Sequence, residues 1–200
     1  MEIIYFDEIK STQQYLLENL KENMCIWSDN QTSGIGSRGN NWLGEKGNLF
    51  FSFSIHKENL VNDLPLQSIS IYYMYQLKEI LKKLGSSVKF KWPNDLYLEN
   101  KVGGIISNIK NDIIIIGIGL NTKQSKFYSY LDINISNKII IKEYFKYLSM
   151  KKNWNEIFIN YEKEFYNDKF VTSDNINLNK YKLNKDGSIE KNNERIYSLR

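Results

Sequence analysis

The sequence predicts an α+β fold in which helices pack on one mixed β-sheet, followed by a small all-β appendage. Three observations predict it. Four short apolar segments follow one another over residues 87–120 with only turn signals between them, whereas a doubly wound parallel sheet alternates strands with helices. Helical periodicity is confined to a few other segments. From about residue 167 the chain becomes polar and rich in turn residues. We therefore expect a main domain over residues 1–166 and a small β domain over residues 167–200, which is too short to hold a core unaided.

The elements of the first third follow from apolar patterning and capping residues. Strands are predicted over residues 2–6, 24–27 and 48–55. Ser11 and Thr12 offer N-caps for an amphipathic helix that runs to about residue 21. The third of these strands alternates large apolar residues with polar or aromatic neighbours, which is typical of a sheet with one face on the core.

The remaining elements are read in the same way. A long helix is predicted from about residue 64 to residue 84, because Pro65 suits a first turn and Gly85 suits a C-terminal cap. Strands are predicted over residues 87–92, 95–98, 101–110 and 112–120, helices over residues 141–149 and 153–166, and a hairpin at Asp186-Gly187. The strand over residues 112–120 is apolar on both faces, which indicates a place inside the sheet.

Composition excludes several classes of protein. The 200 residues are 42% hydrophobic and 14% aromatic, enough for one folded core. No apolar run approaches the roughly 20 residues that cross a bilayer, and no secretory signal is recognisable. Cys25 is the single cysteine, which excludes a disulfide framework and a cysteine zinc site. The net charge of +4 comes from scattered lysines, so we expect a cytoplasmic protein that binds neither membranes nor nucleic acid.

A glycine loop raises the first question of function. Gly34, Gly36 and Gly39 have the spacing of a dinucleotide-binding turn, but that turn must open a helix, and here the chain leads into a predicted strand. Two interpretations remain: a plain connection between strands, or an anion cradle of backbone N–H groups. In the second, Arg38 adds a forked donor and Trp42 offers a flat face to a planar base.

Two further stretches favour the cradle. The run Lys91-Trp92-Pro93-Asn94-Asp95 is followed by Lys101 and a glycine pair, Gly103-Gly104, inside an apolar strand. Glycine weakens a strand unless something approaches it closely. Gly117 and Gly119 interrupt the next strand in the same way. The three regions predict one cleft lined by backbone, with Lys91, Lys101 and Arg38 able to point in.

The chemistry is restricted by what the sequence lacks. His56 is the only histidine, and we expect it at a strand end facing solvent. No Ser-His-Asp set or GxSxG motif is present, and Cys25 has no base near it in sequence, so nucleophilic catalysis by the protein is not expected. Cations and backbone donors around an anionic ligand favour positioning and charge neutralisation, as in reactions that displace phosphate.

At this point the motifs of the chain resemble those of biotin protein ligases. They are "KSTQQYLL" (Lys10–Leu17), "NQTSGIGSRGNNW" (Asn30–Trp42), "KWPNDLYL" (Lys91–Leu98), "NKVGGII" (Asn100–Ile106), "GIGLN" (Gly117–Asn121) and the final "ERIYSLR". The resemblance covers essentially the whole chain. It implies the biotin/lipoate ligase catalytic fold over residues 1–166, with residues 167–200 as an SH3-like appendage. Lipoate and octanoyl transferases share this fold but not the pair KWPND and K-x-G-G-I.

The resemblance implies a reaction of two steps. The carboxylate of biotin attacks the α-phosphate of MgATP, which gives biotinyl-5′-AMP and pyrophosphate. A lysine of a biotin carboxyl carrier protein, such as that of acetyl-CoA carboxylase, then attacks the acyl-adenylate. The expected ligands are therefore biotin, ATP and Mg²⁺, and the expected state is a monomer or weak homodimer. Two alternatives stay open: a lipoate- or octanoate-handling relative, or a non-catalytic module that binds biotin or its adenylate.

The resemblance also implies which residues act. Lys101, Asp95 and Arg38 are the catalytic candidates; Lys101 holds the biotin carboxylate, and Asp95 orients or deprotonates the acceptor lysine. The biotin-binding candidates are Ser11, Thr12, Gln13, Gln31, Thr32, Gly34, Gly36, Ser37, Arg38, Lys101, Gly103 and Gly104. The nucleotide-binding candidates are Trp42, Lys91, Asn94, Gly117, Gly119 and Asn121. No residue is assigned to the metal, because phosphates and water can supply the ligands of Mg²⁺.

Two features depart from the family pattern. The family loop usually reads G-R-G-R-x-x-R-x-W, and Ile35, Ser37 and Asn40 stand at its three arginine positions. Loss of guanidinium groups weakens a hold on phosphate, so we expect a looser adenylate, held in part by Arg38 with Lys46 and Lys91. Met1 also leads straight into the first predicted strand, so we expect the monofunctional form without a DNA-binding domain.

Overall fold

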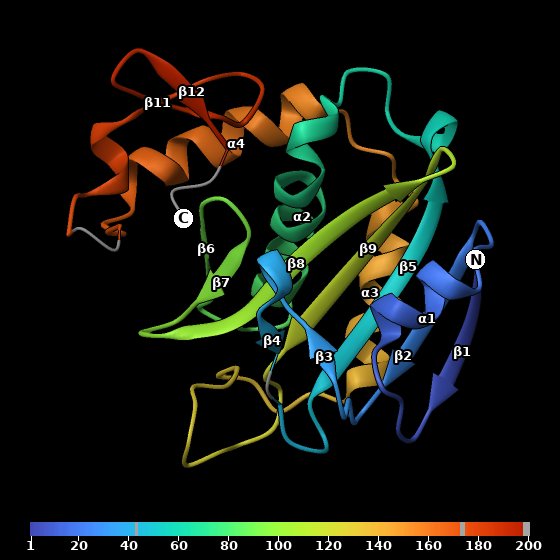
Figure 1. The fold of residues 1–200 in the computed structure, drawn as a ribbon. Coiled ribbons are helices and arrows are strands. Elements are labelled where there is room, and N and C mark those ends of the chain that lie inside the picture. Colours follow the sequence, from blue (N-terminus) through green and yellow to red (C-terminus); the bar gives the residue numbers. More distant parts are fainter. Residues whose placement is uncertain (43, 173–174, 198–200) are drawn as a thin grey trace.

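The computed structural model of the chain describes residues 1–42, 44–172 and 175–197, with the backbone alone at Arg38. At its centre lies a seven-stranded sheet in the order β1-β2-β5-β9-β8-β7-β6 (Figure 1). Its strands are β1 (Glu2–Phe6), β2 (Met24–Ser28), β5 (Leu49–His56), β6 (Lys89–Lys91), β7 (Asp95–Tyr97), β8 (Lys101–Lys110) and β9 (Ile113–Leu120). β1 and β2 are parallel, and the other neighbours in the sheet are antiparallel. This mixed sheet confirms the predicted α+β class.

Helices cover both faces of the sheet. In the described residues the α-helices are α1 (Thr12–Glu18), α2 (Ile69–Lys83), α3 (Asn137–Leu148) and α4 (Trp154–Asn167). α1 lies on one face, against β2, β5 and β9, whereas α2 and α3 lie behind the other face (Figure 1). Across the described ranges, no helix combines the length and the apolar character needed to cross a membrane.

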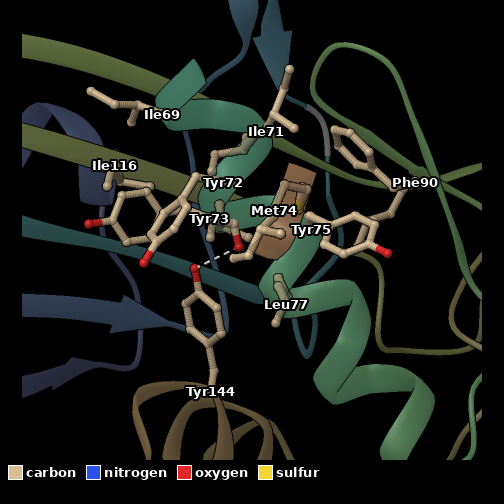
Figure 2. Close-up of a cluster of buried hydrophobic side chains, with 14 of the residues drawn as sticks. Ile69, Ile71, Tyr72, Tyr73, Met74, Tyr75, Leu77, Phe90, Ile116 and Tyr144 are labelled. Carbon is tan, nitrogen blue, oxygen red and sulfur yellow. Dashed lines mark hydrogen bonds between the residues drawn. The ribbon is translucent and has the colours of Figure 1, made fainter. Parts of the chain in front are cut away.

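Each face of the sheet has its own apolar core. The larger core joins Phe53 and Ile116 of the central strands to α2 and α3. Figure 2 shows part of it, including Tyr144 of α3, whose hydroxyl donates to a backbone carbonyl of α2 at 3.0 Å. The smaller core joins Leu16 of α1 to Ile115 on the opposite face. Successive residues of β9 thus serve different cores, which explains why this strand is apolar on both sides.

The structure corrects several predicted boundaries. α2 begins at Ile69, later than predicted, because Pro65 precedes a short 3₁₀ helix over Leu66–Ser68 instead of entering the α-helix. α1 ends at Glu18, earlier than predicted, and α3 begins at Asn137, earlier than predicted. Helical periodicity marks the apolar face of a helix, but it does not separate the last α-turn from an adjoining 3₁₀ or irregular turn.

The glycine loop forms a small hairpin that the sequence did not predict. β3 (Gly34–Ile35) pairs antiparallel with β4 (Asn41–Trp42), and a 3₁₀ turn lies between them. The N–H of Gly36 donates to the carbonyl of Asn40 at 2.6 Å, which closes the turn. A strand and not a helix follows the third glycine, so the rejection of a dinucleotide-binding turn is confirmed.

The small C-terminal sheet packs on the rest of the chain. It consists of β10 (Lys182–Leu183), β11 (Ile189–Lys191) and β12 (Glu194–Ile196), all antiparallel, and fits the SH3-like appendage. Its first hairpin is held by two indoles: Trp92 Nε1 donates to the carbonyl of Gly187 at 2.8 Å, and Trp154 Nε1 donates to that of Lys185 at 2.7 Å. The division after residue 166 stays a prediction, and α4 runs to Asn167.

Candidate active site

The β3–β4 hairpin lies over the glycine-containing ends of β8 and β9 (Figure 1). A Cβ at Gly119 would lie 2.7 Å from the indole of Trp42, and a Cβ at Gly104 would lie 3.0 Å from it. Because real Cβ atoms essentially never come within 3.0 Å of another atom, Gly119 is needed to admit this indole, and a Cβ at Gly104 would press on it tightly. The sequence predicted that some group comes close to these glycine-containing strands, and that group is the side chain of Trp42. Its buried Nε1 has no hydrogen-bond partner among the described residues.

Two adjoining cavities lie beneath and beside this hairpin. The smaller measures about 120 Å³ and the larger about 680 Å³. They share wall residues from the hairpin and from β8, including Ser37 and Ile105. The predicted site residues that line the smaller cavity are Ser11, Thr12, Gln13, Gln31, Gly36, Ser37, Trp42, Asn94, Lys101, Gly104, Gly117 and Gly119. Lys91, Asn94 and Asp95 line the larger one, together with residues of the C-terminal segment.

The amides of Gln31 and Gln13 form the polar end of the smaller cavity. Thr12 donates its N–H to Gln31 Oε1 at 2.7 Å and its hydroxyl to the same oxygen at 3.1 Å. Gln31 Nε2 therefore points away from Thr12. The opposite holds at Gln13, whose Nε2 donates to Asn108 Oδ1 at 2.9 Å and to the carbonyl of Ile115 at 3.3 Å. Gln31 thus turns its nitrogen toward Gly34, whereas Gln13 turns its oxygen toward Gly117.

The oxygen of Gln13 lies against the backbone of β9. A Cβ at Gly117 would lie 2.4 Å from Gln13 Oε1, so only glycine admits the amide here. This Oε1 is buried and, in the part of the chain that the structure describes, accepts no hydrogen bond. An unpaired buried acceptor costs about 1–3 kcal/mol. The cavity end therefore favours a ligand that brings an N–H donor.

Ser52 is a site residue that the sequence analysis missed. It is fully buried, lines the smaller cavity, and its hydroxyl lies 2.8 Å from that of Thr12. Ser11 beside it accepts the N–H of Gln14 and so caps α1, as predicted. A buried serine among the phenylalanines of β5 was the available signal, but periodicity alone does not tell a cavity-lining hydroxyl from a core one.

Lys101 lines the smaller cavity, and its ion-pair partner Asp95 lines the adjoining larger one. Lys101 Nζ is 2.7 Å from Asp95 Oδ1 and 5.2 Å from the ring centroid of Trp42. The Asp95 side chain is 6% exposed, whereas that of Lys101 is 33% exposed. Trp42 is in turn the strand partner of Gly34. The ammonium therefore points toward the hairpin and not away into solvent, as the predicted cleft requires. Asn94 joins the turn to β8, because its Nδ2 donates to the carbonyl of Ile105 at 2.9 Å.

Several predicted site residues line neither cavity. Thr32 is exposed, and Gly34 and Gly103 are buried behind the walls. A Cβ at Gly103 would lie 2.5 Å from Leu120 Cδ2, so this glycine serves packing. Asn121 donates its Nδ2 to the carbonyl of Ser129 at 2.9 Å, which closes the base of the following loop.

Lys46 and Lys91, which were expected to help Arg38 hold the adenylate, do not line the same cavity. Lys46 pairs with Asp7 at 3.0 Å and lines neither cavity; the hydrogen bond with Asp7 raises the pKa of Lys46. Lys91 lines the larger cavity, with Nζ 4.7 Å above the ring of Tyr97. The side chain of Arg38 lies outside what the structure describes, as do the last three residues of the C-terminal motif. Lys46 therefore lies outside both cavity walls, and its part in holding the adenylate stays a prediction.

Other catalytic chemistries find no support in the described residues. Burial raises the pKa of the Cys25 thiol far above its ordinary value, so no thiolate is available. His56 stands at the end of β5 and accepts the N–H of Glu58, as expected of a residue at a strand end. Within the described ranges, no group of three or more His, Cys, Asp or Glu side chains could hold a metal ion.

Comparisons with known proteins identify the family of the chain. Residues 5–121 match the biotin/lipoate A/B protein ligase family. The chain belongs to this family. Its match to biotin–protein ligase 2 of Arabidopsis thaliana is 33% identical and covers 60% of this chain and 40% of that protein. Its match to the bifunctional ligase/repressor BirA of Escherichia coli is 35% identical and covers 56% of this chain and 38% of that protein. The matched region thus spans about two fifths of these curated family members.

Solved structures of family members extend the likeness to nearly the whole chain. Biotin acetyl coenzyme A carboxylase synthetase of Helicobacter pylori, solved with bound biotinylated ATP, superposes with a TM-score of 0.89 at 38% identity, over 97% of this chain and 98% of that one. Biotin protein ligase of Aquifex aeolicus, solved with biotin and ATP, gives a TM-score of 0.73 at 23% identity over 98% and 96% of the two chains. The second likeness shows the shared fold. The biotin/lipoate ligase fold predicted from the motifs is therefore confirmed.

Proposed function

We propose that this chain is an ATP-dependent biotin protein ligase. In the first step a carboxylate oxygen of biotin bonds to the α-phosphorus of ATP, and the bond from that phosphorus to the β-phosphate oxygen breaks, so pyrophosphate leaves. In the second step a lysine amine of a carrier protein bonds to the acyl carbon, loses a proton, and AMP leaves. Family membership and the likeness to a synthetase solved with biotinylated ATP support this proposal.

The pair of oppositely facing amides is the observation that carries the choice of substrate. The ureido ring of biotin has N–H donors and a carbonyl acceptor, which suit the oxygen of Gln13 and the nitrogen of Gln31. The dithiolane of lipoate and the chain of octanoate have neither group. Either would leave the buried Gln13 Oε1 unpaired, at a cost of about 1–3 kcal/mol. A polar cavity end therefore favours biotin over the substrates of the other branches of the family.

Lys101 supplies the charge that the first step requires. Bringing a carboxylate to within about 4 Å of a phosphate costs about 4 kcal/mol per pair of unit charges at an effective dielectric constant of about 20. The ammonium of Lys101, beside Trp42 at the cavity wall, offsets this repulsion and stabilises the charge that develops on the transferred phosphate. Arg38, which stands one place from an arginine position of the family loop, is proposed to take part in the same task.

Asp95 is assigned to the second step. The acceptor lysine has an ordinary pKa of about 10.4, so it is protonated and unreactive near neutral pH. A carboxylate in the wall of the larger cavity, paired with Lys101 of the smaller one, can orient this amine or accept its proton. Its ion pair with Lys101 keeps the acid and the cation of the two steps next to each other.

The remaining ligands and partners are part of the proposal. Mg²⁺ binds with ATP through phosphate oxygens and water. Trp42, Lys91, Asn94, Gly117, Gly119 and Asn121 are the proposed nucleotide residues. The acceptor is a biotin carboxyl carrier protein such as that of acetyl-CoA carboxylase, the protein acts as a monomer or weak homodimer without DNA or membrane, and the compartment is the cytoplasm.

One experiment tests the function. The protein is mixed with MgATP, biotin and a carrier domain, and the carrier is weighed by mass spectrometry; the expected product carries one biotinyl group. Pyrophosphate release in the absence of carrier tests the first step separately, and excludes a module that only binds. Lipoate and octanoate replace biotin in parallel reactions. Transfer of either of these acids in preference to biotin would overturn the assignment.

A further inference from the structure

Asn108 lies on the half of β8 that has an open edge. β7 pairs with β8 from Lys101 to Gly104, whereas β9 pairs along it as far as Lys110. Among the described residues, Asn108 therefore has a strand neighbour on one side only. It is exposed and lines the larger cavity. Its Oδ1 nevertheless accepts a hydrogen bond from Gln13, a residue of α1 that lines the smaller cavity.

This hydrogen bond decides which way the amide of Gln13 faces. A primary amide has an acceptor at one end and two donors at the other. Asn108 is the register partner of Ile115 on β9. The oxygens of both residues accept from Gln13 Nε2, at 2.9 Å and 3.3 Å. Two acceptors on neighbouring strands thus hold the nitrogen and turn the oxygen toward Gly117, and both Gln13 and Gly117 line the smaller cavity.

The oxygen that this arrangement turns inward is the one without a partner. Gln13 is 3% exposed, and its Oε1 accepts no hydrogen bond within the described part of the chain. Buried acceptors of this kind are uncommon and costly, unless a ligand supplies the donor. We infer that Asn108 is a positioning residue for substrate: it holds the Gln13 oxygen toward the cavity, where that oxygen accepts an N–H of a ureido ring. The inference rests on the proposed function.

The size of the effect follows from the two bonds. The bond to Asn108 is the shorter, and the bond to the Ile115 carbonyl is longer than usual for N–H···O. Without Asn108 the Ile115 carbonyl still opposes a flip of the Gln13 amide, so the orientation of this amide is weakened but not lost. If the Gln13 amide flipped, its own N–H donors would face the N–H donor of the ureido ring. A buried site built for one hydrogen bond strongly rejects a ligand that cannot make that bond.

The test measures the dissociation constant of biotin by calorimetry in the absence of ATP. Asn108→Leu keeps the approximate volume, removes the acceptor and excludes water from Gln13 Nε2. We expect about tenfold weaker binding, equivalent to about 1.4 kcal/mol. Asn108→Asp keeps an acceptor and should bind within about twofold of the unmodified protein. Ile109→Ala is the matched control, because Ile109 is exposed on the same strand and lines neither cavity.

A second ligand separates positioning from a purely structural role. Biotin is compared with an analogue methylated on its ring nitrogen, which lacks the donor. The unmodified protein should prefer biotin, and Asn108→Leu should reduce that preference about tenfold, since the analogue never used the Gln13 oxygen. A structural defect would weaken both ligands equally. Circular dichroism and the melting temperature show whether each variant is folded.

The outcomes distinguish the two proposals. If the unmodified protein does not bind biotin, the proposed function fails and the inference falls with it. If it binds biotin, but Asn108→Leu leaves the affinity or the preference over the analogue unchanged, the inference alone is overturned. It is also overturned if Asn108→Asp binds as weakly as Asn108→Leu, because then an acceptor at this position makes no difference.

Discussion

At the scale of residues, the site is assembled from glycines that admit neighbouring side chains. Gly117 admits the amide of Gln13, and Gly104 and Gly119 admit the indole of Trp42. Each side chain reaches its position because the strand beneath it lacks a Cβ. The same wall then holds the ammonium of Lys101 above the indole, 5.2 Å from the ring centroid. The positions of the Gln13 and Trp42 side chains therefore depend on close contact with the backbone of β8 and β9.

The charge of Lys101 gives the first prediction. Lys101→Met keeps most of the side-chain length and removes the ammonium, so the first step should slow by about 10²–10³-fold, as when one stabilising donor is removed from an active site. Pyrophosphate release with biotin and ATP measures it. Lys110→Met, at the exposed far end of the same strand, is the control. An unchanged rate in Lys101→Met would remove this residue from the chemistry.

The contact between Gly119 and Trp42 gives the second prediction. Gly119→Ala places a Cβ 2.7 Å from the indole, which must move. The KM for ATP should rise by about 10–100-fold, because a displacement of about 1 Å in a site has effects of that order. Steady-state pyrophosphate release at varied ATP concentration checks it.

Gly103→Ala is the matched comparison for this prediction. Its Cβ would meet Leu120 in the core, behind the cavity wall. We expect a lower melting temperature with a smaller change in the KM for ATP, because overpacking of a core costs about 1–3 kcal/mol. Equal effects of the two alanines on KM would mean that Trp42 has no special part in nucleotide binding.

At the scale of elements, a buried cation joins two helices behind the sheet. Lys78 of α2 is 1% exposed, and its Nζ lies 2.6 Å and 2.7 Å from the two carboxylate oxygens of Glu164 on α4. It also lies 2.8 Å from Glu79 and 4.0 Å from the ring centroid of Tyr75. Because α4 carries Trp154, which holds the C-terminal hairpin, this network connects the main sheet to the small one.

Loss of this network gives the third prediction. Glu164→Ala leaves a buried ammonium with one carboxylate and should lower the free energy of unfolding by about 2 kcal/mol, less than for a fully buried pair since Glu164 is partly solvated. Lys78→Met should cost about 1 kcal/mol or less, because the remaining carboxylates can hydrate. Urea denaturation measures both, with exposed Lys163→Ala as the control. A greater loss of unfolding free energy in Lys78→Met than in Glu164→Ala would contradict this prediction.

At the scale of the whole molecule, two aspartates accept several hydrogen bonds each, in two separate segments of the chain. Asp132 accepts from Ser86 and Ser87, which fixes the end of the loop before α3. Burial raises the pKa of Asp132, but these hydrogen bonds outweigh it and hold the pKa below its ordinary value. Asp186, in the C-terminal hairpin, behaves in the same way: burial opposes the shift, and bonds from Ser188 and other donors lower its pKa.

These shifts give the fourth prediction, which concerns pH. A lowered folded-state pKa stabilises the fold above the unfolded value, 3.8 for both groups, and this stability is lost as the pH falls through the lower folded values. The urea midpoint should therefore fall between about pH 5 and about pH 3. Asp132→Asn with Asp186→Asn removes both titrations and should show a smaller fall. An identical fall would place the acid sensitivity elsewhere.

Much of this arrangement could be predicted from local pattern. The strand over Glu2–Phe6 is as expected, and the run of strands after Gly85 gave the correct fold class. Twelve predicted residues line the smaller cavity, because their motifs bring glycines and polar groups to neighbouring strands. The start of α2 was less predictable, since Pro65 suits a 3₁₀ turn as well as an α-turn.

The sequence by itself determined the class of fold, the family and the set of chemical groups available, because these depend on periodicity, capping and the order of motifs along the chain. Only the tertiary structure decided how those groups face one another. It placed Ser52 and Asn108 beside residues distant in sequence, turned Lys46 toward Asp7, and set Lys101 against Asp95. The physical reason is that orientation depends on hydrogen-bond partners and close contacts from other strands, and spacing along one strand contains no information about its neighbours.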